Sequence, residues 1–270
     1  MSYEVPKSIR RFRHAGVALI LLAGSGLTTH AQGAINLGAA SSFGVLGGSG
    51  VTNTGTTVVN GDVGVSPGTS ITGFPPGSAT GSIRINDGLA QQAHADLATA
   101  YGVLTGEART STLTGQDLGA LILNPGVFFF SSSAQLTGQL TLDGQGNANS
   151  KFHFQIGNTL TTAINSSVRL INGANVNNVF FQVGSSATLG PGTQFAGNIL
   201  ALTSITMNTG ATDLGGRALA SNGTVNLDTN QLGPTASATP ATPEPSVSAF
   251  LVCFGLTSGV ALRRRRTRSK

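Results

Sequence analysis

The segment Phe154-Gln155-Ile156-Gly157 returns later in the chain as Phe181-Gln182-Val183-Gly184. A second pair of segments repeats in the same way: Gln194-Phe195-Ala196-Gly197 corresponds to Asp213-Leu214-Gly215-Gly216. Intervals of about twenty to thirty residues between related segments are typical of solenoids, in which each repeat stacks on its neighbours. The repeats therefore predict short strands and tight corners that rise by one layer per coil, with Val, Leu, Ile and Phe stacked inside.

Apolar residues alternate with small polar residues in short segments that end at Gly or Asn. This alternation indicates strands with one face inside and one outside, and Gly and Asn suit corners because both tolerate a positive φ. A β-sandwich is the alternative, but it would use two-residue hairpin turns, which are scarce here. The expected strands are 43–46, 120–123, 126–130, 139–142, 151–156, 167–171, 178–183, 198–202, 204–207 and 223–227.

One segment, residues 87–105, has the period of a helix instead. Leu89, Ala93, Leu97, Ala100 and Leu104 recur every three or four residues and predict one apolar stripe. An aspartate at 87 can cap the start and a glycine at 106 the end. We expect a single long α-helix packed alongside the solenoid.

The first 31 residues have the layout of a secretory signal peptide. A basic start is followed by an apolar run at 15–27 and by Thr29-His30-Ala31, which predicts cleavage after Ala31. A buried N-terminal helix is the alternative interpretation. The sequence therefore predicts export, and residues 32–232 as one structured domain.

The other end of the chain also has the layout of a targeting signal. Residues 233–242 predict a linker rich in Pro and small residues, and Pro243-Glu244-Pro245 then precedes an apolar run at 246–262 and a basic cluster at 263–270. The run is about as long as the shortest membrane-spanning helices, and the arginines favour a cytoplasmic end. This arrangement resembles the PEP-CTERM sorting signal of Gram-negative bacteria. The resemblance implies transient membrane anchoring, removal of the tail by exosortase and a place outside the cell or on its surface.

The end segments also account for the basic character of the chain. Ten of the 15 Lys and Arg residues lie in them, which leaves the body with five basic and eight acidic residues. A net charge of −3 gives no support to nucleic-acid binding, which needs a basic face. The only cysteine, Cys253, lies in the C-terminal apolar run, so the body is expected to fold without a disulfide.

The body shows no pattern that predicts catalysis, a cofactor or a metal. It lacks a P-loop, a dinucleotide-binding fingerprint and a nucleophile elbow, and its carboxylates are scattered. His94 is expected on the polar side of the helix and His153 on the outside of a strand. Asn60-Gly61-Asp62-Val63-Gly64 resembles part of a calcium loop but lacks the remaining ligands, so a structural corner is the better interpretation. We expect a protein that is not an enzyme.

Several strands place Ser, Thr, Asn or Gln on both sides of one apolar residue, so that the polar side chains should face outward. On stacked strands they would form a neutral grid with spacings of ~6.6 Å along a strand and ~4.8 Å between strands, close to oxygen repeats in ice. The alternative is that Thr is simply a favourable exposed strand residue. The candidate residues are Ser133, Gln135, Thr159, Thr161, Ser186, Thr188, Ser204, Thr206, Thr224 and Asn226.

Several longer motifs have the form of a known family. They include residues 59–68, 112–119 with 123–127, 132–138, 178–184 and 205–211. Together they resemble the ice-binding-protein-like family over nearly all of residues 34–232. The resemblance implies a right-handed parallel β-solenoid of triangular cross-section with a long helix alongside, and ice binding through one flat face without metal or cofactor. It adds Ser42 and Gly44 of the first strand to the candidates.

The sequence thus predicts a secreted, monomeric protein that adsorbs to ice crystals and inhibits their growth or recrystallisation. Its other partners would be signal peptidase and exosortase during export. The alternative is a structural or adhesive protein of the cell surface or the exopolysaccharide matrix. A polysaccharide-degrading β-helix enzyme is disfavoured because clustered charged residues are not evident.

Overall fold

The computed structural model of the chain describes residues 35–235. Within this range the strands form three sheets, called sheets A, B and C, and every strand pairing is parallel. For most of its length the chain visits A, B and C in turn, so one coil contributes one strand to each sheet. Parallel coils confirm the predicted β-solenoid with a flanking helix and exclude the β-sandwich, whose sheets are antiparallel.

The elements have the following bounds. Sheet A consists, in spatial order, of β7 (Ile83–Ile85), β4 (Asp62–Val65), β1 (Phe43–Gly47), β22 (Arg217–Ala220), β19 (Asn198–Ala201), β16 (Val179–Val183), β13 (Phe152–Ile156), β10 (Gly126–Phe130) and β8 (Ser111–Thr112). Sheet B consists of β11 (Ala134–Leu136), β14 (Leu160–Thr162), β17 (Ala187–Leu189), β20 (Ile205–Met207), β23 (Thr224–Asp228), β2 (Gly50–Thr54) and β5 (Ser70–Thr72). Sheet C consists of β6 (Ser78–Ala79), β3 (Val58–Val59), β24 (Gln231–Gly233), β21 (Thr212–Leu214), β18 (Gln194–Phe195), β15 (Ser167–Ile171), β12 (Gln139–Asp143) and β9 (Ile122–Leu123). The helices are η1 (Gly38–Ser42), α1 (Gly88–Gly106) and η2 (Val176–Asn178).

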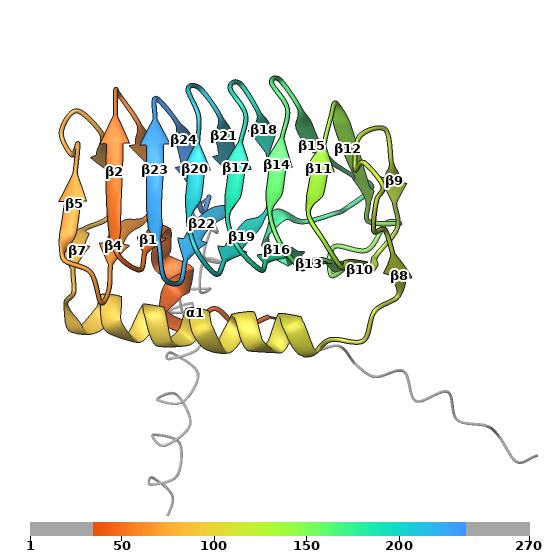
Figure 1. Cartoon of the computed structure of the whole chain (residues 1–270), viewed down its shortest axis with the longest axis horizontal. Coiled ribbons are helices and arrows are strands. Elements are labelled where there is room, and N and C mark those ends of the chain that lie inside the picture. Colours follow the sequence, from red (N-terminus) through yellow and green to blue (C-terminus); the bar gives the residue numbers. More distant parts are fainter. Residues whose placement is uncertain (1–34, 236–270) are drawn as a thin grey trace, which may run out of the picture. The chain divides into compact units, whose positions relative to one another are not determined.

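The order of the coils in space differs from their order along the chain (Figure 1). The first two coils, β1 to β6, lie at one end, and β7 forms the edge of sheet A there. Helix α1 then runs along the solenoid to β8 at the opposite edge. The later coils stack back toward the first, so the last coil, β22 to β24, pairs with β1 to β3.

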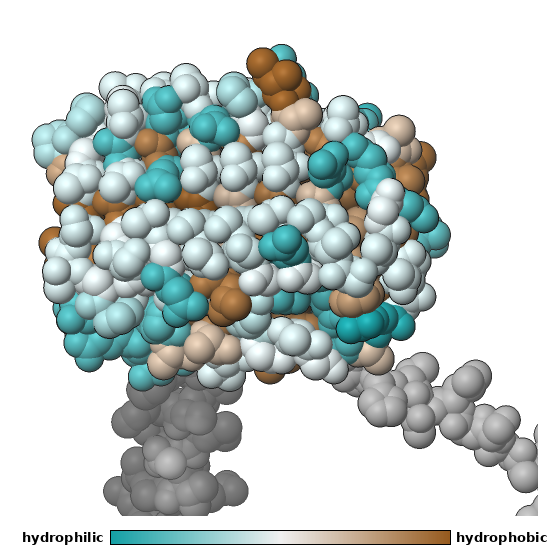
Figure 2. Space-filling model, viewed as in Figure 1, coloured by the Kyte–Doolittle hydropathy of each residue, from teal (hydrophilic) through white to brown (hydrophobic). Residues whose placement is uncertain are grey.

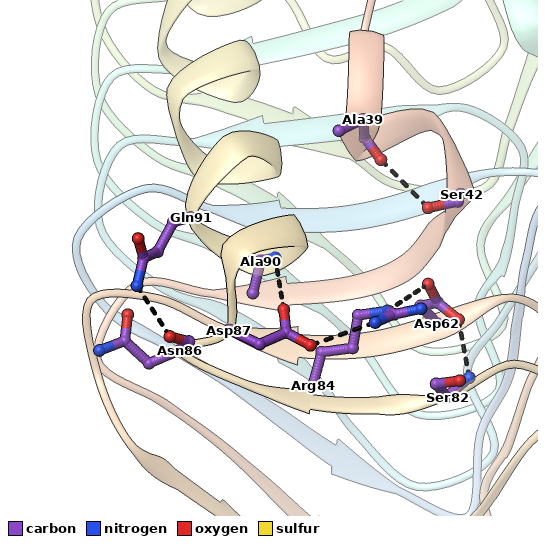
Figure 3. A network of polar contacts seen from close by, with 9 residues as sticks. All are labelled: Ala39, Ser42, Asp62, Ser82, Arg84, Asn86, Asp87, Ala90 and Gln91. Atoms are coloured by element: carbon purple, nitrogen blue, oxygen red, sulfur yellow. Dashed lines mark hydrogen bonds and ion pairs between the residues drawn. The ribbon is translucent and has the colours of Figure 1, made fainter.

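Helix α1 starts at a side-chain cap. The Ala90 N–H donates to Asp87 Oδ1 over 2.8 Å, which satisfies one of the free donors at the helix start. Arg84 bonds both Asp87 and Asp62, over 3.1 and 2.9 Å, and so links the helix start to the neighbouring strand β4 (Figure 3). Hydrogen bonds from the Arg84 side chain and from the Ala90 N–H to Asp87 thus fix the loop that turns the chain into the helix.

The apolar stripe of α1 packs on sheet A and forms a core of its own with Phe43, Leu46, Phe180, Leu200 and Leu219. The buried helix residues are Ala90, Ala93, Leu97, Ala100 and Leu104. The prediction was wrong for Leu89, which is 37% exposed, because Ala90 takes that position on the buried face. The predicted end was also one residue short, since Gly106 is the last helical residue and Glu107 is the cap.

A stack of aromatic rings runs through the main core between the three sheets. Phe154 lies parallel to Phe181 with ring centroids 4.4 Å apart, and Phe128 and Phe195 continue the stack on either side. Glycines directly follow β13 and β16, and this repetition has a steric reason. A Cβ at Gly184 would lie 2.4 Å from the Gly157 carbonyl oxygen, so side chains would block the close stacking of the coils.

The structure also bears on the predicted strand 120–123, the corner at 60–64 and the predicted membrane segment. The predicted strand 120–123 is only Ile122–Leu123, because Ala120 has a φ of 62°. Asn60–Gly64 forms a corner with Gly61 at a φ of 90°, and both Asp62 carboxylate oxygens accept hydrogen bonds, from the Ser82 N–H and Arg84. No helix within residues 35–235 is long and apolar enough to span a bilayer. The predicted signal peptide, most of the linker, the sorting motif and the apolar segment 246–262 lie outside the described residues.

Candidate functional site

Sheet B carries a continuous row of outward polar side chains, called the central row. Its residues are brought together by the strand register, one per coil, although they come from distant parts of the sequence. On four of these strands the residues on either side of the row position are buried, and all of them except Thr162 are apolar. In spatial order the row is Gln135, Thr161, Thr188, Thr206, Asn226, Thr52 and Thr72.

A second row, called the flanking row, lies two residues earlier in the chain, at the start of the same strands or immediately before it. Thr159 Oγ1 donates to Ser133 Oγ over 2.8 Å, and the backbone N–H groups of Ser204 and Thr224 donate to the serine hydroxyl of the preceding coil. These hydroxyls therefore bond along the solenoid axis and hold each other in place. In spatial order the row is Ser133, Thr159, Ser186, Ser204, Thr224, Gly50 and Ser70.

The two rows form a rigid, uncharged plane. Side chains two apart on a strand are separated by ~6.6 Å and neighbouring strands by ~4.8 Å, so the rows form a regular grid of hydroxyl and methyl groups. Neither row contains Asp, Glu, Lys, Arg or His, and nearly all of its side chains are partly or fully exposed. Figure 2, which views the molecule from this side, shows a mostly pale surface of weakly polar residues over sheet B.

The other two sheets offer no comparable plane. Sheet A is covered by α1, which buries the outward residues of its middle strands. Sheet C is open but uneven. It exposes Arg169, and it exposes Ile122 to 70% and Leu214 to 54%. Sheet B is therefore the face on which small neutral side chains gather.

The structure brings ten of the twelve predicted site residues to this face and leaves two elsewhere. Ser42 lies in η1, and Gly44 is buried in β1 of sheet A. The resemblance placed both on the face wrongly, because Ser42 precedes the first strand and that strand joins sheet A. The structure adds two strands that the prediction missed, with Gly50 and Thr52 on β2 and Ser70 and Thr72 on β5. Ser70-Ile71-Thr72 has the same polar–apolar–polar pattern as the other members and could have been found by it.

Both predicted surface histidines are at least partly covered. His153 does face outward from its strand, but α1 lies over it, and its ring bonds the Glu107 carboxylate and packs edge-on against Phe180. His94 Nε2 lies 2.7 Å from the Ser221 carbonyl oxygen, so it faces the solenoid and not the polar side of the helix. Both histidines therefore fasten the helix to the coils.

The most perturbed ionisable group lies in the core, away from sheet B. Asp213 is fully buried on β21, and burial raises the pKa of its carboxyl group to about 8. A hydrogen bond from the Gly197 N–H and the charge of Arg217 oppose this shift. Within residues 35–235, no cluster of three or more His, Cys, Asp or Glu residues has the arrangement of a metal site.

The fold and the face together define a class of protein: a parallel β-solenoid, flanked by a helix, whose uncovered sheet presents a flat neutral grid suited to binding an extended surface. A family model described as ice-binding-like matches residues 45–233, and the chain belongs to this family. An ice-binding protein of Nostoc sp. (strain HG1) is 52% identical over 262 residues, which cover 95% of this chain and 97% of that protein.

Solved structures of similar proteins agree with this assignment. A crystal structure of an ice-binding protein from the Antarctic ascomycete Antarctomyces psychrotrophicus has a TM-score of 0.73 and 46% sequence identity, covering 76% of this chain and all of that one. An ice-binding protein from an Antarctic biological consortium gives the same TM-score with 45% identity and covers 75% of this chain and 91% of that chain.

Proposed function

We propose that the protein binds ice through sheet B and thereby inhibits ice growth and recrystallisation. The observation that carries this proposal is the pair of neutral rows, which run in register across seven strands of one uncovered sheet. The names of the relatives in the same family support the choice of ice as the ligand.

The flatness and rigidity of sheet B favour its adsorption to a crystal surface. A β-solenoid fixes the backbone of every row residue before binding, so little conformational freedom remains to be lost on adsorption. Hydroxyl groups can hold water in an ice-like arrangement. Removal of the threonine methyl groups from liquid water lowers the free energy of the system and so favours adsorption. A charged group on the face would have to be desolvated at a cost, and the rows contain none.

The handedness and cross-section of the coils, the oligomeric state and the route of export are also proposals. We propose right-handed coils of triangular section, supported by the three strands per coil, and a monomer that acts by adsorption without catalysis. Residues 1–31 and 243–270 support export with a signal peptide and a PEP-CTERM sorting signal. These segments would make signal peptidase and exosortase transient partners.

Ice recrystallisation provides the test. Polycrystalline ice held just below its melting point coarsens with time, and micromolar purified protein should keep the grains small at concentrations where albumin does not. Grain growth at the rate of the albumin control would contradict ice binding. Tight binding to extracellular polysaccharide in that case would favour the matrix role.

A further inference from the structure

The face on sheet B is assembled from two parts of the chain that meet at a seam. Strands β2 and β5 come from residues 50–72, whereas the other five strands come from residues 134–228. The two blocks pair at β2 and β23. No corner loop joins them there, because the chain connects them through α1 on the other side, over sheet A. The seam is therefore held by noncovalent contacts alone.

Several residues of the last coil form hydrogen bonds to both neighbouring coils, and three of them, Arg217, Asn230 and Asn226, use a side chain for at least one of these bonds. Arg217 donates to the Ser41 carbonyl oxygen over 2.9 and 3.1 Å and to Asn198 Oδ1 over 2.7 Å. Asn230 donates from its backbone N–H to Thr57 Oγ1 and from its side chain to the Asn208 carbonyl oxygen, both over 3.0 Å. Both of these side chains are buried and lie off the face.

The third such residue, Asn226, lies in the central row itself. Thr52 Oγ1, from the first block, donates to Asn226 Oδ1 over 2.9 Å. The other end of the same amide, Asn226 Nδ2, donates to Thr206 Oγ1 over 3.3 Å. One side chain thus bonds a threonine on each side and spans the seam on the face.

A threonine at this position would not do the same. Within the described residues, no side-chain hydrogen bond joins Thr161 to Thr188, Thr188 to Thr206, or Thr52 to Thr72, although each pair is in register on adjacent strands. At these three pairs of the central row, the threonine hydroxyls do not bond each other across the strand spacing of ~4.8 Å. The amide group is longer and carries a donor and an acceptor that point in opposite directions.

We propose that Asn226 is a positioning residue of the face, which fixes the hydroxyl groups of Thr206 and Thr52 and keeps the two blocks of the central row in one plane across the seam. This inference rests on the proposed ice-binding function. It explains why a residue without a methyl group occupies the middle of a threonine row.

The decisive comparison replaces each of the two amides in the central row by threonine. Asn226→Thr removes the side-chain bond across the seam and the bond to Thr206. Gln135→Thr makes a similar change at the far end of the row, where the amide side chain bonds no other residue within the described range. We expect Asn226→Thr to raise the protein concentration needed to stop recrystallisation roughly fivefold, the factor that one net hydrogen bond carries. Gln135→Thr should lower that concentration, because it extends the threonine row. An Asn226→Thr protein as active as the parent, or an equal loss in both variants, would overturn the proposal.

A second variant keeps the test valid if Asn226→Thr also lowers stability. Thr52→Val keeps the shape of the side chain and removes only the hydroxyl, so it should cost about as much activity as Asn226→Thr, and the double variant should cost no more than either change alone. Additive losses would contradict a shared role. Amide hydrogen exchange of β2 and β23 should become faster in all three variants relative to β14. Exchange tests the seam without ice, so an inactive parent protein would refute the proposed function alone, and unchanged exchange would refute this inference.

Discussion

Replacing Thr188 by tyrosine should abolish close contact between the centre of the face and an ice surface. Thr188 lies on β17, in register with Thr161 and Thr206 on the adjacent strands. The substitution removes the Thr188 methyl group, and a ring that projects above this position holds the methyl groups of Thr161 and Thr206 away from the crystal, which makes three methyl groups in all. At ~0.8 kcal/mol per apolar carbon, the loss is about 2 kcal/mol. Since 1.4 kcal/mol is a factor of ten, adsorption should weaken more than tenfold.

The assay is thermal hysteresis together with the lowest protein concentration that stops recrystallisation. Gln194→Tyr is the matched control, because Gln194 is exposed on sheet C in the same coil. It should leave both values unchanged. Tyrosine is favourable on exposed strands, so both variants should melt within about 2 °C of the parent. Equal activity of the Thr188→Tyr variant and the parent would refute the assignment of the face.

Three further predictions follow from the same structure. Thr206→Tyr should reduce recrystallisation inhibition as Thr188→Tyr does, whereas Thr212→Tyr on sheet C of the same coil should not, and equal losses would contradict the difference between the faces. Asp213 has a pKa of about 8 in the folded protein against 3.8 ordinarily, so the folded state binds the proton more tightly. The free energy of unfolding should therefore fall between about pH 4 and pH 8, by up to about 1 kcal/mol per pH unit. Urea titrations of the Asp213→Asn variant should lack this pH-dependent fall. Leu97→Ala should cost about 2–5 kcal/mol of stability by urea unfolding, because Leu97 is fully buried between α1 and sheet A, yet ice binding by the folded variant should persist.

The local structure of the coils was largely predictable from the sequence. Repeated glycines, alternating strands and the stripe of α1 each reflect interactions between close neighbours in the chain or in adjacent coils. The closure of the solenoid was not predictable in this way. Val45 pairs with Ala218 and Gly50 with Thr224, and nothing in either segment specifies a partner so distant in sequence.

The candidate site was also predictable only in its local features. Alternation correctly oriented Thr161, Thr188 and Thr206, because a residue between two core positions must face outward. It could not show that β2 and β5 extend the face, since that depends on the closure. It also could not show that α1 covers His153, because alternation fixes the direction of a side chain but not what lies above it.

The most direct test of the central claim is partition into growing ice. A solution of the purified protein, mixed with the Thr188→Tyr/Thr206→Tyr double variant and albumin, is frozen slowly onto a cold surface, and the protein in the ice is compared with that left in the liquid. The parent should be enriched in the ice, while the double variant and albumin remain in the liquid. Exclusion of the parent together with albumin would contradict ice binding, and equal uptake of parent and double variant would show that sheet B is not the binding face.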